Sequence, residues 1–125
     1  MTPLQQQFDI LKVGYPQAQL TDLPDGSHLI TVPDFKLPPG WSKPQVTVKF
    51  IAPPGYPFGR PDCFWADSDL KLANGSPPQR TGFNAIPHVG GTHLWFSWHV
   101  GAWNSNFDSL LTFLNVIKSR LNAPG

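Results

Sequence analysis

A serine and two histidines lie close together in the aromatic run HLWFSWHV, residues 93–100. If this run is extended, His93, Ser97 and His99 share one face, because side chains along a strand alternate with a period of two. A serine beside a histidine is the minimum for a base-assisted nucleophile, and such a serine can carry an acyl group as an oxyester. The pattern therefore predicts Ser97 as an acyl carrier, with His99 or His93 as its base.

A base of this kind needs a third group to orient it, and the run itself does not supply one. An aspartate would have to reach the base through the fold, and the candidates are Asp67, Asp69 and Asp108. Two alternatives stay open. Ser97 and His99 could be polar members of an aromatic packing strip, or His88, His93 and His99 could hold a metal ion. Because no closely spaced histidine pair supports the metal site, we expect no metal and no other cofactor.

The composition is that of one globular domain. The chain has 125 residues, 40% of them hydrophobic, which is enough for a single core. The net charge is +1 without any lysine or arginine run, so nothing indicates a nucleic-acid partner. No apolar run approaches the roughly 20 residues of a membrane span, and no signal-peptide pattern is present. With a single cysteine, Cys63, which is compatible with a reducing compartment, we expect a cytoplasmic protein.

The apolar periodicity predicts a helix near each end and strands between them. Helical spacing predicts helices over residues 4–13 and 106–121, the second capped by Ser105 and Asp108. Alternation and turn residues predict four strands, at residues 18–23, 29–32, 46–51 and 62–66. Residues 67–92 are polar and rich in Gly and Pro, and are expected to form one long loop. This order indicates an α+β fold with an antiparallel, four-stranded meander.

A proline-rich loop, IAPPGYPFGRPDCFW at residues 51–65, joins the third predicted strand to the fourth. Its four prolines lack N–H groups and cannot all lie inside a sheet ladder. The rings of Tyr56 and Phe58 are expected to pin this loop rigidly onto the core. If Phe35 and Trp41 are exposed on the preceding loop, residues 34–44, they could instead anchor a protein partner.

Two segments resemble ubiquitin-conjugating enzymes, which have the UBC fold. TVKFIAPPGYPFGRPDCFW, residues 47–65, is similar to the family's strand, Y-P-F-x-x-P loop and following strand. WNSNFDSLLTFLNVIKSRL, residues 103–121, is similar to its W-S-P segment and the helix after it, with Trp103 at the Trp position. Phe107, Leu110, Leu111 and Leu114 take the apolar positions of that helix. The FSWH and W-x-x-x-x-D patterns resemble the bacterial UBC-like group lettered E.

The chain departs from the family at the active site. Ordinary members carry a thioester-forming cysteine shortly before the Trp, and that spacing falls near Leu94 or Trp95 here. Cys63 occupies an apolar strand position instead and is expected to be a buried core residue. The family's H-P-N segment has no clear counterpart, although Asn74 and Asn84 are candidates to replace its Asn.

The resemblance implies one UBC-like domain over residues 1–125, with residues 67–92 as a remodelled active-site loop. It implies a ubiquitin-like protein and a ThiF-type activating enzyme as partners, with a JAB-type peptidase in the same pathway. We expect an atypical bacterial conjugating protein that carries the partner's tail as an oxyester on Ser97. The alternatives are a catalytically inactive adaptor for the same partners, and a domain that kept the fold for unrelated peptide or protein binding.

Overall fold

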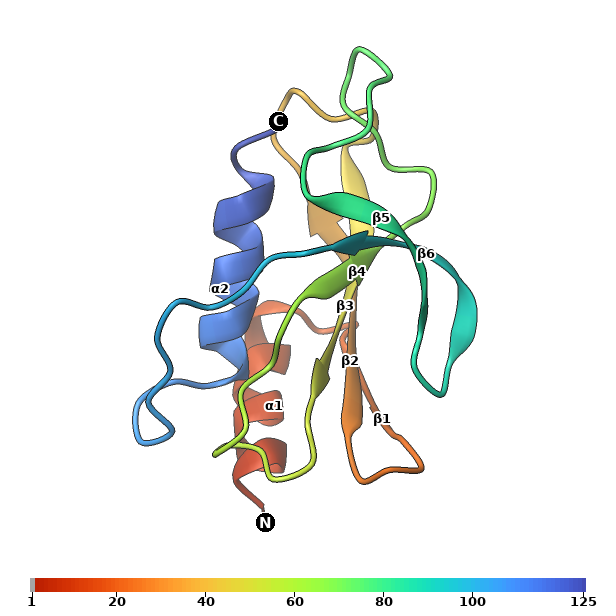
Figure 1. The fold of residues 1–125 in the computed structure, drawn as a ribbon. Coiled ribbons are helices and arrows are strands. Elements are labelled where there is room, and N and C mark those ends of the chain that lie inside the picture. The colour runs from red at the N-terminus through yellow and green to blue at the C-terminus, as the bar shows by residue number, and fades with distance from the viewer. Residues whose placement is uncertain (1) are drawn as a thin grey trace.

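The computed structural model describes residues 2–125, in which two helices pack on one face of a six-stranded sheet (Figure 1). The elements are, in chain order, α1 (Pro3–Gly14), β1 (Gln19–Asp22), β2 (His28–Lys36), β3 (Gln45–Ala52), β4 (Phe64–Ala66), β5 (Thr81–Ile86), β6 (Gly90–Phe96) and α2 (Leu110–Leu121). The strand order is β1-β2-β3-β4-β6-β5, and all neighbours are antiparallel. The predicted α+β class and its terminal helices are confirmed, but the sheet has six strands rather than four.

The two additional strands lie mainly in the stretch predicted to be one long loop, residues 67–92. Only residues 67–80 of that stretch stay irregular, because β5 and β6 then form a hairpin. The hairpin joins the sheet through β6, which places Trp95 opposite Trp65 of β4. Strand β5 could not be predicted from the sequence because Ile86 is its only buried residue. The strand therefore shows no alternation of apolar and polar positions.

Strand β2 also continues beyond its predicted end at Pro33. The register shifts between Val32 and Phe35, and Asp34 has a φ of 58°. A bulge of this kind accommodates a proline inside a sheet, since the missing N–H group falls where the ladder is interrupted. The strand then resumes and buries Phe35 on the same face as Val32.

Helix α2 begins at Leu110, four residues later than predicted. Its cap is Ser109, whose hydroxyl accepts a hydrogen bond from the Thr112 main-chain nitrogen at 3.4 Å. The Thr112 hydroxyl accepts in return from the Ser109 nitrogen at 2.9 Å. This reciprocal capping box replaces the predicted cap of Ser105 and Asp108.

The main core fills the space between the helices and one face of the sheet. Phe113 of α2 packs on Phe50 of β3 with ring centroids 5.1 Å apart. Phe64 of β4 stacks on Phe96 of β6 at 4.5 Å. Neither helix within residues 2–125 has the length and apolar character that crossing a membrane requires.

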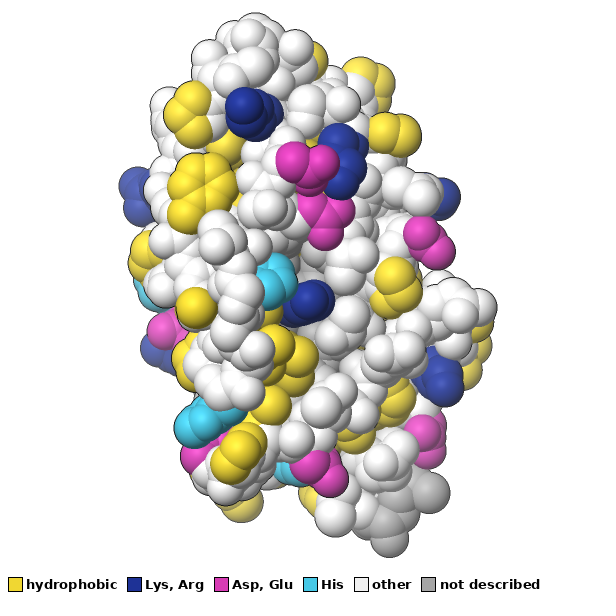
Figure 2. Space-filling model, turned by 90° about the vertical axis from the view of Figure 1, so that its right-hand side faces the viewer, with side chains coloured by type: hydrophobic (Ala, Val, Ile, Leu, Met, Phe, Trp, Pro, Cys, Tyr) yellow, Lys and Arg dark blue, Asp and Glu magenta, His cyan; other side chains and the backbone are white. Residues whose placement is uncertain are grey.

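A smaller apolar cluster lies on the other face of the sheet. Its buried members are Leu23, Leu29, Trp65 and Ile86. The β5–β6 hairpin supplies Ile86, and His88 at its tip lies 3.6 Å from Asp25 in the β1–β2 turn. Figure 2 shows this side of the molecule, where small hydrophobic patches alternate with scattered charges. The hairpin therefore covers part of a sheet face that would otherwise be open to solvent.

Candidate functional site

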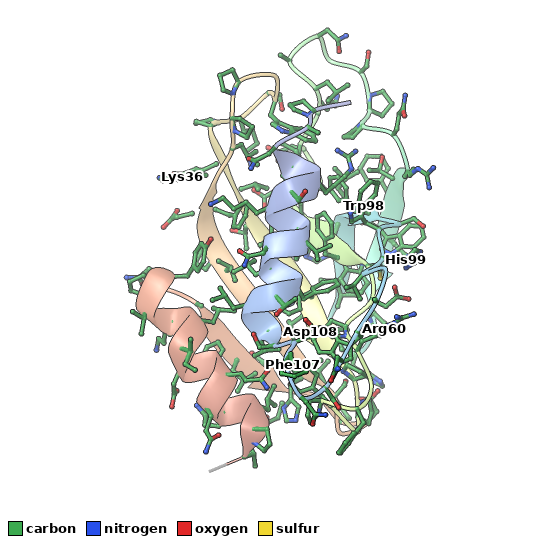
Figure 3. The ribbon with its side chains drawn as sticks, turned by 90° about the vertical axis from the view of Figure 1, so that its left-hand side faces the viewer. Lys36, Arg60, Trp98, His99, Phe107 and Asp108 are labelled. Carbon is green, nitrogen blue, oxygen red and sulfur yellow. The ribbon has the colours of Figure 1, made fainter. Side chains whose placement is uncertain are left out.

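The segment that carries Ser97 and His99 leaves the sheet before it reaches them. Strand β6 ends at Phe96, and the Trp98 nitrogen turns back to donate to the Phe96 oxygen at 3.0 Å. The Ser97 nitrogen donates to the Arg80 oxygen at 2.8 Å. The predicted shared face of an extended strand is therefore wrong beyond Phe96. Figure 3 shows Trp98 and His99 to one side of α2, with Arg60 of the proline loop nearby.

His99 acquires a carboxylate partner from the proline loop. Its Nδ1 contacts Asp62 Oδ1, and both side chains are more than half exposed. The contact arises because residues 62–63 run beside residues 98–99, where the Cys63 nitrogen donates to the Trp98 oxygen at 3.0 Å. A carboxylate that accepts from Nδ1–H orients the imidazole and leaves Nε2 as the basic nitrogen. The contact therefore places a carboxylate at Nδ1 of His99, where the orienting group of a histidine base would lie.

None of the three aspartates considered from the sequence contacts His99. Asp67 and Asp69 both bind Lys43, at 2.8 and 3.0 Å. Asp108 accepts from the Asn104 main-chain nitrogen at 2.6 Å. Asp62 was missed because it lies 37 residues from His99, and no local pattern links positions so far apart.

Ser97, the predicted nucleophile, is half-exposed. No hydrogen bond joins it to His99 within residues 2–125; the side-chain bond that His99 forms runs to Asp62. Hydrogen bonds between a nucleophile and its base are often made only when substrate binds. The structure thus brings His99 together with Asp62, and Ser97 lies two residues before His99 along the chain.

His93 is held apart from this pair. It lies within β6, four residues before Ser97, a separation of about 13 Å along a strand. Its Nε2 lies 3.2 Å from Lys49 Nζ, and because lysine only donates, Nε2 must accept. Burial, helped by the Lys49 charge, lowers the pKa of His93. Its basic nitrogen is therefore already occupied, and His99 is the better candidate for the base.

The histidines do not gather into a metal site. Among residues 2–125, no group of three or more His, Cys, Asp or Glu side chains could hold a metal ion. His88 faces Asp25, His93 faces Lys49, and His99 faces Asp62, so each has a different neighbour.

Cys63 is half-buried rather than fully buried, which corrects the expectation from sequence. It packs against the outer cluster beside Trp95 and has a φ of 53°. Burial raises the pKa of its thiol, which lowers the fraction of reactive thiolate at neutral pH. Of the two residues at which the spacing predicts the family's cysteine, Leu94 is buried in the main core and Trp95 is half-buried.

The proposed replacements for the family's asparagine have other roles. Asn74 closes a turn in which its Oδ1 accepts from the Ser76 nitrogen at 2.9 Å. Asn84 is exposed on β5, opposite His93. Neither forms a hydrogen bond with Ser97 or His99 among the bonds of residues 2–125.

The exposed aromatic residues are not the expected ones. Phe35 and Trp41 are buried, so neither can anchor a partner. Trp41 Nε1 instead donates to the Leu121 oxygen at 2.7 Å, at the end of α2. Phe58 and Phe107 were expected to pack inward, but they are 85% and 82% exposed. Both are therefore available on loops that flank the candidate site.

These features define a class of protein. An N-terminal helix, an antiparallel meander, a Y-P-F-x-x-P loop after the third strand, and a closing helix preceded by Trp103 define a UBC-like protein. A family model described as prokaryotic E2 family E matches residues 10–123, and the chain belongs to this family. The comparisons with curated proteins and with solved structures each found no match.

Proposed function

We propose that this chain acts in a ubiquitin-like modification pathway as a conjugating-type protein that carries its partner's tail as an oxyester on Ser97. Membership of the prokaryotic E2 family E supports the pathway. The observation that carries the residue assignment is the contact between His99 and Asp62, since Ser97 precedes His99 by two residues. The only cysteine in the chain, Cys63, has a raised thiol pKa and sits away from the family's cysteine position.

The proposed step is a transfer from a thioester to a hydroxyl. The Ser97 Oγ attacks the carbonyl carbon of a tail held as a thioester on an activating enzyme, and His99 Nε2 takes the hydroxyl proton. The new O–C bond replaces the C–S bond, and the proton passes from the imidazolium to the departing thiolate. Asp62 keeps the imidazole in the tautomer that accepts this proton and stabilises the imidazolium.

The partners follow from the pathway. The tail belongs to a ubiquitin-like protein, and a ThiF-type activating enzyme supplies its thioester. A JAB-type peptidase in the same pathway would reverse the modification. Membership of the E2 family supports a ubiquitin-like protein and an activating enzyme as partners in general.

The second candidate is an adaptor that binds the same partners without chemistry. Its supporting observation is the pair of exposed phenylalanines, Phe58 and Phe107. Their loops are tied together, because Trp103 Nε1 donates to the Pro57 oxygen at 2.9 Å. Exposed aromatic side chains held on a rigid frame are the usual anchors of protein interfaces.

A charging assay separates the two candidates. The protein is mixed with the ubiquitin-like protein, the activating enzyme, ATP and Mg²⁺, and the products are measured by intact mass spectrometry after treatment with thiol or with hydroxylamine. An oxyester survives thiol and falls to hydroxylamine. We expect such an adduct in the wild type and in Cys63→Ser, and none in Ser97→Ala.

The orienting carboxylate is tested in the same assay. Asp62→Asn is expected to slow charging by about 100-fold, as the loss of an efficient general base does. An adduct that thiol removes and that Cys63→Ser abolishes would contradict the serine mechanism. If the activating enzyme charges and this protein never does, the adaptor remains, and Phe58→Ser with Phe107→Ser should then weaken partner binding by about tenfold.

A further inference from the structure

Strand β1 forms one edge of the sheet and has an open side (Figure 1). Within residues 2–125 it pairs with β2 alone. The Leu23 nitrogen donates to the Ser27 oxygen at 2.9 Å, which fixes the main-chain groups that face β2. Because these groups alternate along a strand, Thr21 also faces β2, whereas Leu20 and Asp22 point their N–H and C=O groups away from the sheet. These groups are therefore open to a further strand.

A groove runs beside this open edge, between β1 and α1. It has a volume of about 500 Å³ and is lined by residues 18–22 and, from α1, by Gln5, Phe8 and Lys12. These three side chains lie on one side of the helix, since they are three and four residues apart. Leu20 faces the groove and packs partly against the main core. A strand added to β1 would therefore place every second side chain in the groove, under α1.

The two ends of the groove carry opposite charges. Only residues 15–18 separate the end of α1 from β1, so Lys12 lies at the end of the groove where β1 begins. Asp22 lies at the other end, beside residues 2–5 at the start of α1. Asp22 contacts His28 at 2.8 Å, but its side chain remains 87% exposed. Lys12 is exposed and takes part in none of the ion pairs within residues 2–125.

We infer that a second copy of this chain occupies the groove and pairs its β1 strand antiparallel to β1. A two-fold axis through the middle of the edge brings Leu20 opposite Leu20 of the second copy, where each donates to the other and accepts from it. The same register places Asp22 of the second copy beside Ala18, at the Lys12 end of the groove. By symmetry, Lys12 of the second copy meets Asp22 at the other end. The surface is therefore complementary to itself in both hydrogen bonding and charge.

The charge arrangement favours a second copy over an unrelated strand. An occupant must bring an acid to Lys12 and a cation to Asp22, and this chain already carries both charges at the two ends of one groove. A parallel pairing in register would instead bring the two Asp22 carboxylates together, which is unfavourable. Asp22 also protects the edge, because a strand without a matching cation gains nothing from pairing beside an exposed charge.

The pairing leaves the candidate site open. Ser97 follows β6, which lies four strands from β1 in the sheet order, roughly 19 Å at the usual spacing of strands. Two six-stranded sheets would join into one continuous sheet with the helices of both copies on the same face. The two copies of Ser97 and His99 would then lie on opposite sides of the dimer axis. The inference therefore does not depend on the proposed function.

The mass of the full chain in solution gives the first test. It is measured by light scattering after size exclusion, over about a hundredfold range of concentration. We expect the mass to rise from 13.8 kDa toward twice that value. The dissociation constant should be on the order of 10 μM, because a short edge forms a small interface. Added salt should weaken the dimer, since both ion pairs lie at the surface.

Two charge reversals test the register. Lys12→Asp and Asp22→Lys each oppose like charges at both ends of the groove and should raise the dissociation constant by about tenfold. An equimolar mixture of the two variants should dimerise like the wild type, because each variant then meets the opposite charge in the other. Both positions are exposed, so the variants should remain folded, which thermal unfolding verifies. Phe83→Lys adds a charge to β5, the other edge of the sheet, and should leave the dimer unchanged.

Amide hydrogen exchange reports on the edge itself. As the concentration of the ¹⁵N-labelled chain rises, the amides of Leu20 and Asp22 should exchange more slowly, because each gains an acceptor in the second copy. The amide of Thr21 already faces β2 and should keep its rate. This alternation distinguishes strand pairing from a contact between side chains alone.

Three results would overturn the inference. The first is a chain that keeps the mass of a monomer at every concentration; if another protein then protects the amides of Leu20 and Asp22, the groove belongs to that partner. The second is a dimer that Phe83→Lys disrupts, and the third is a loss of dimer in Lys12→Asp that mixing with Asp22→Lys does not restore. The charging of Ser97 enters none of these measurements, so the dimer and the proposed function can fail separately.

Discussion

Trp103 Nε1 donates a hydrogen bond of 2.9 Å to the main-chain oxygen of Pro57, which ties the segment before α2 to the proline loop. The Trp103 ring also packs beside Tyr56, with centroids 6.1 Å apart. The Tyr56 hydroxyl donates to Gln7 Oε1, which also accepts from the Leu110 nitrogen at 3.1 Å. One network therefore connects α1, the proline loop and the start of α2.

Trp103→Phe removes this link while keeping an aromatic ring. We expect the free energy of unfolding to fall by about 1 kcal/mol, the usual net value of one hydrogen bond, together with some loss of packing. Urea denaturation measures the change, and hydrogen exchange should quicken in the proline loop. Phe107→Leu, at an exposed position four residues on, should change stability by less than about 0.5 kcal/mol. Equal stabilities for the two variants would show that the link contributes nothing.

The cap of α2 gives a second test. Ser109→Ala removes the hydroxyl that accepts from the Thr112 nitrogen and should destabilise the protein by about 1 kcal/mol. Ser105→Ala alters the serine that the sequence favoured as the cap and should be nearly neutral. Thermal unfolding of the two variants decides between these positions, and a larger loss in Ser105→Ala would place the helix start where the sequence predicted it.

Much of the fold was readable from local sequence patterns. The helices and the first four strands were predicted because their buried residues recur with the right period, as Val46, Val48 and Phe50 do in β3. The sequence predicts the start of helix α2 too early because Phe107 extends the helical spacing of apolar residues toward the N-terminus. In the structure its ring is exposed. Spacing alone cannot tell an apolar residue in the core from one on a loop.

The site was less predictable, because it depends on contacts between distant segments. The sequence indicated Ser97 and His99 from their local pairing, but Asp62 reaches His99 only because the start of β4 runs beside residues 98–99. The burial of Arg120 could not be predicted from the sequence either. An arginine in the last turn of a helix is expected to face solvent and interact with the helix dipole, and only the fold surrounds it with aromatic rings.

The β5–β6 hairpin can be tested through its one buried anchor. Ile86 belongs to the outer cluster with Leu23, Leu29 and Trp65. Ile86→Ala should lower the free energy of unfolding by about 2–4 kcal/mol, as for other buried aliphatic truncations. Val89→Ala, close by but exposed, should cost less than about 0.5 kcal/mol. If Ile86→Ala also leaves the free energy of unfolding unchanged, residues 81–90 do not pack on the sheet. The prediction of a single long loop over residues 67–92 would then be correct.

His93 should make stability depend on pH. Its folded-state pKa lies below the ordinary value of 6.5, chiefly because burial disfavours the charged imidazolium and secondly because Lys49 repels it. The unfolded chain therefore takes up a proton near pH 6.5 that the folded chain takes up only at lower pH. Stability is full above pH 6.5 and is lost as the pH falls from there toward the folded-state pKa.

The measurement is the urea midpoint of wild type and His93→Phe between pH 8 and pH 5. The wild type should lose roughly a few tenths of a kcal/mol over this range, a small value because solvent screens a partly exposed group. His93→Phe should lack that part of the pH dependence, whereas His28→Gln, which leaves His93 and Lys49 in contact, should retain it. A slope that His93→Phe leaves unchanged would mean that His93 is equally easy to protonate in the folded and unfolded chains. The contact with Lys49 would then not hold the ring neutral, and His93 would again be available as a base.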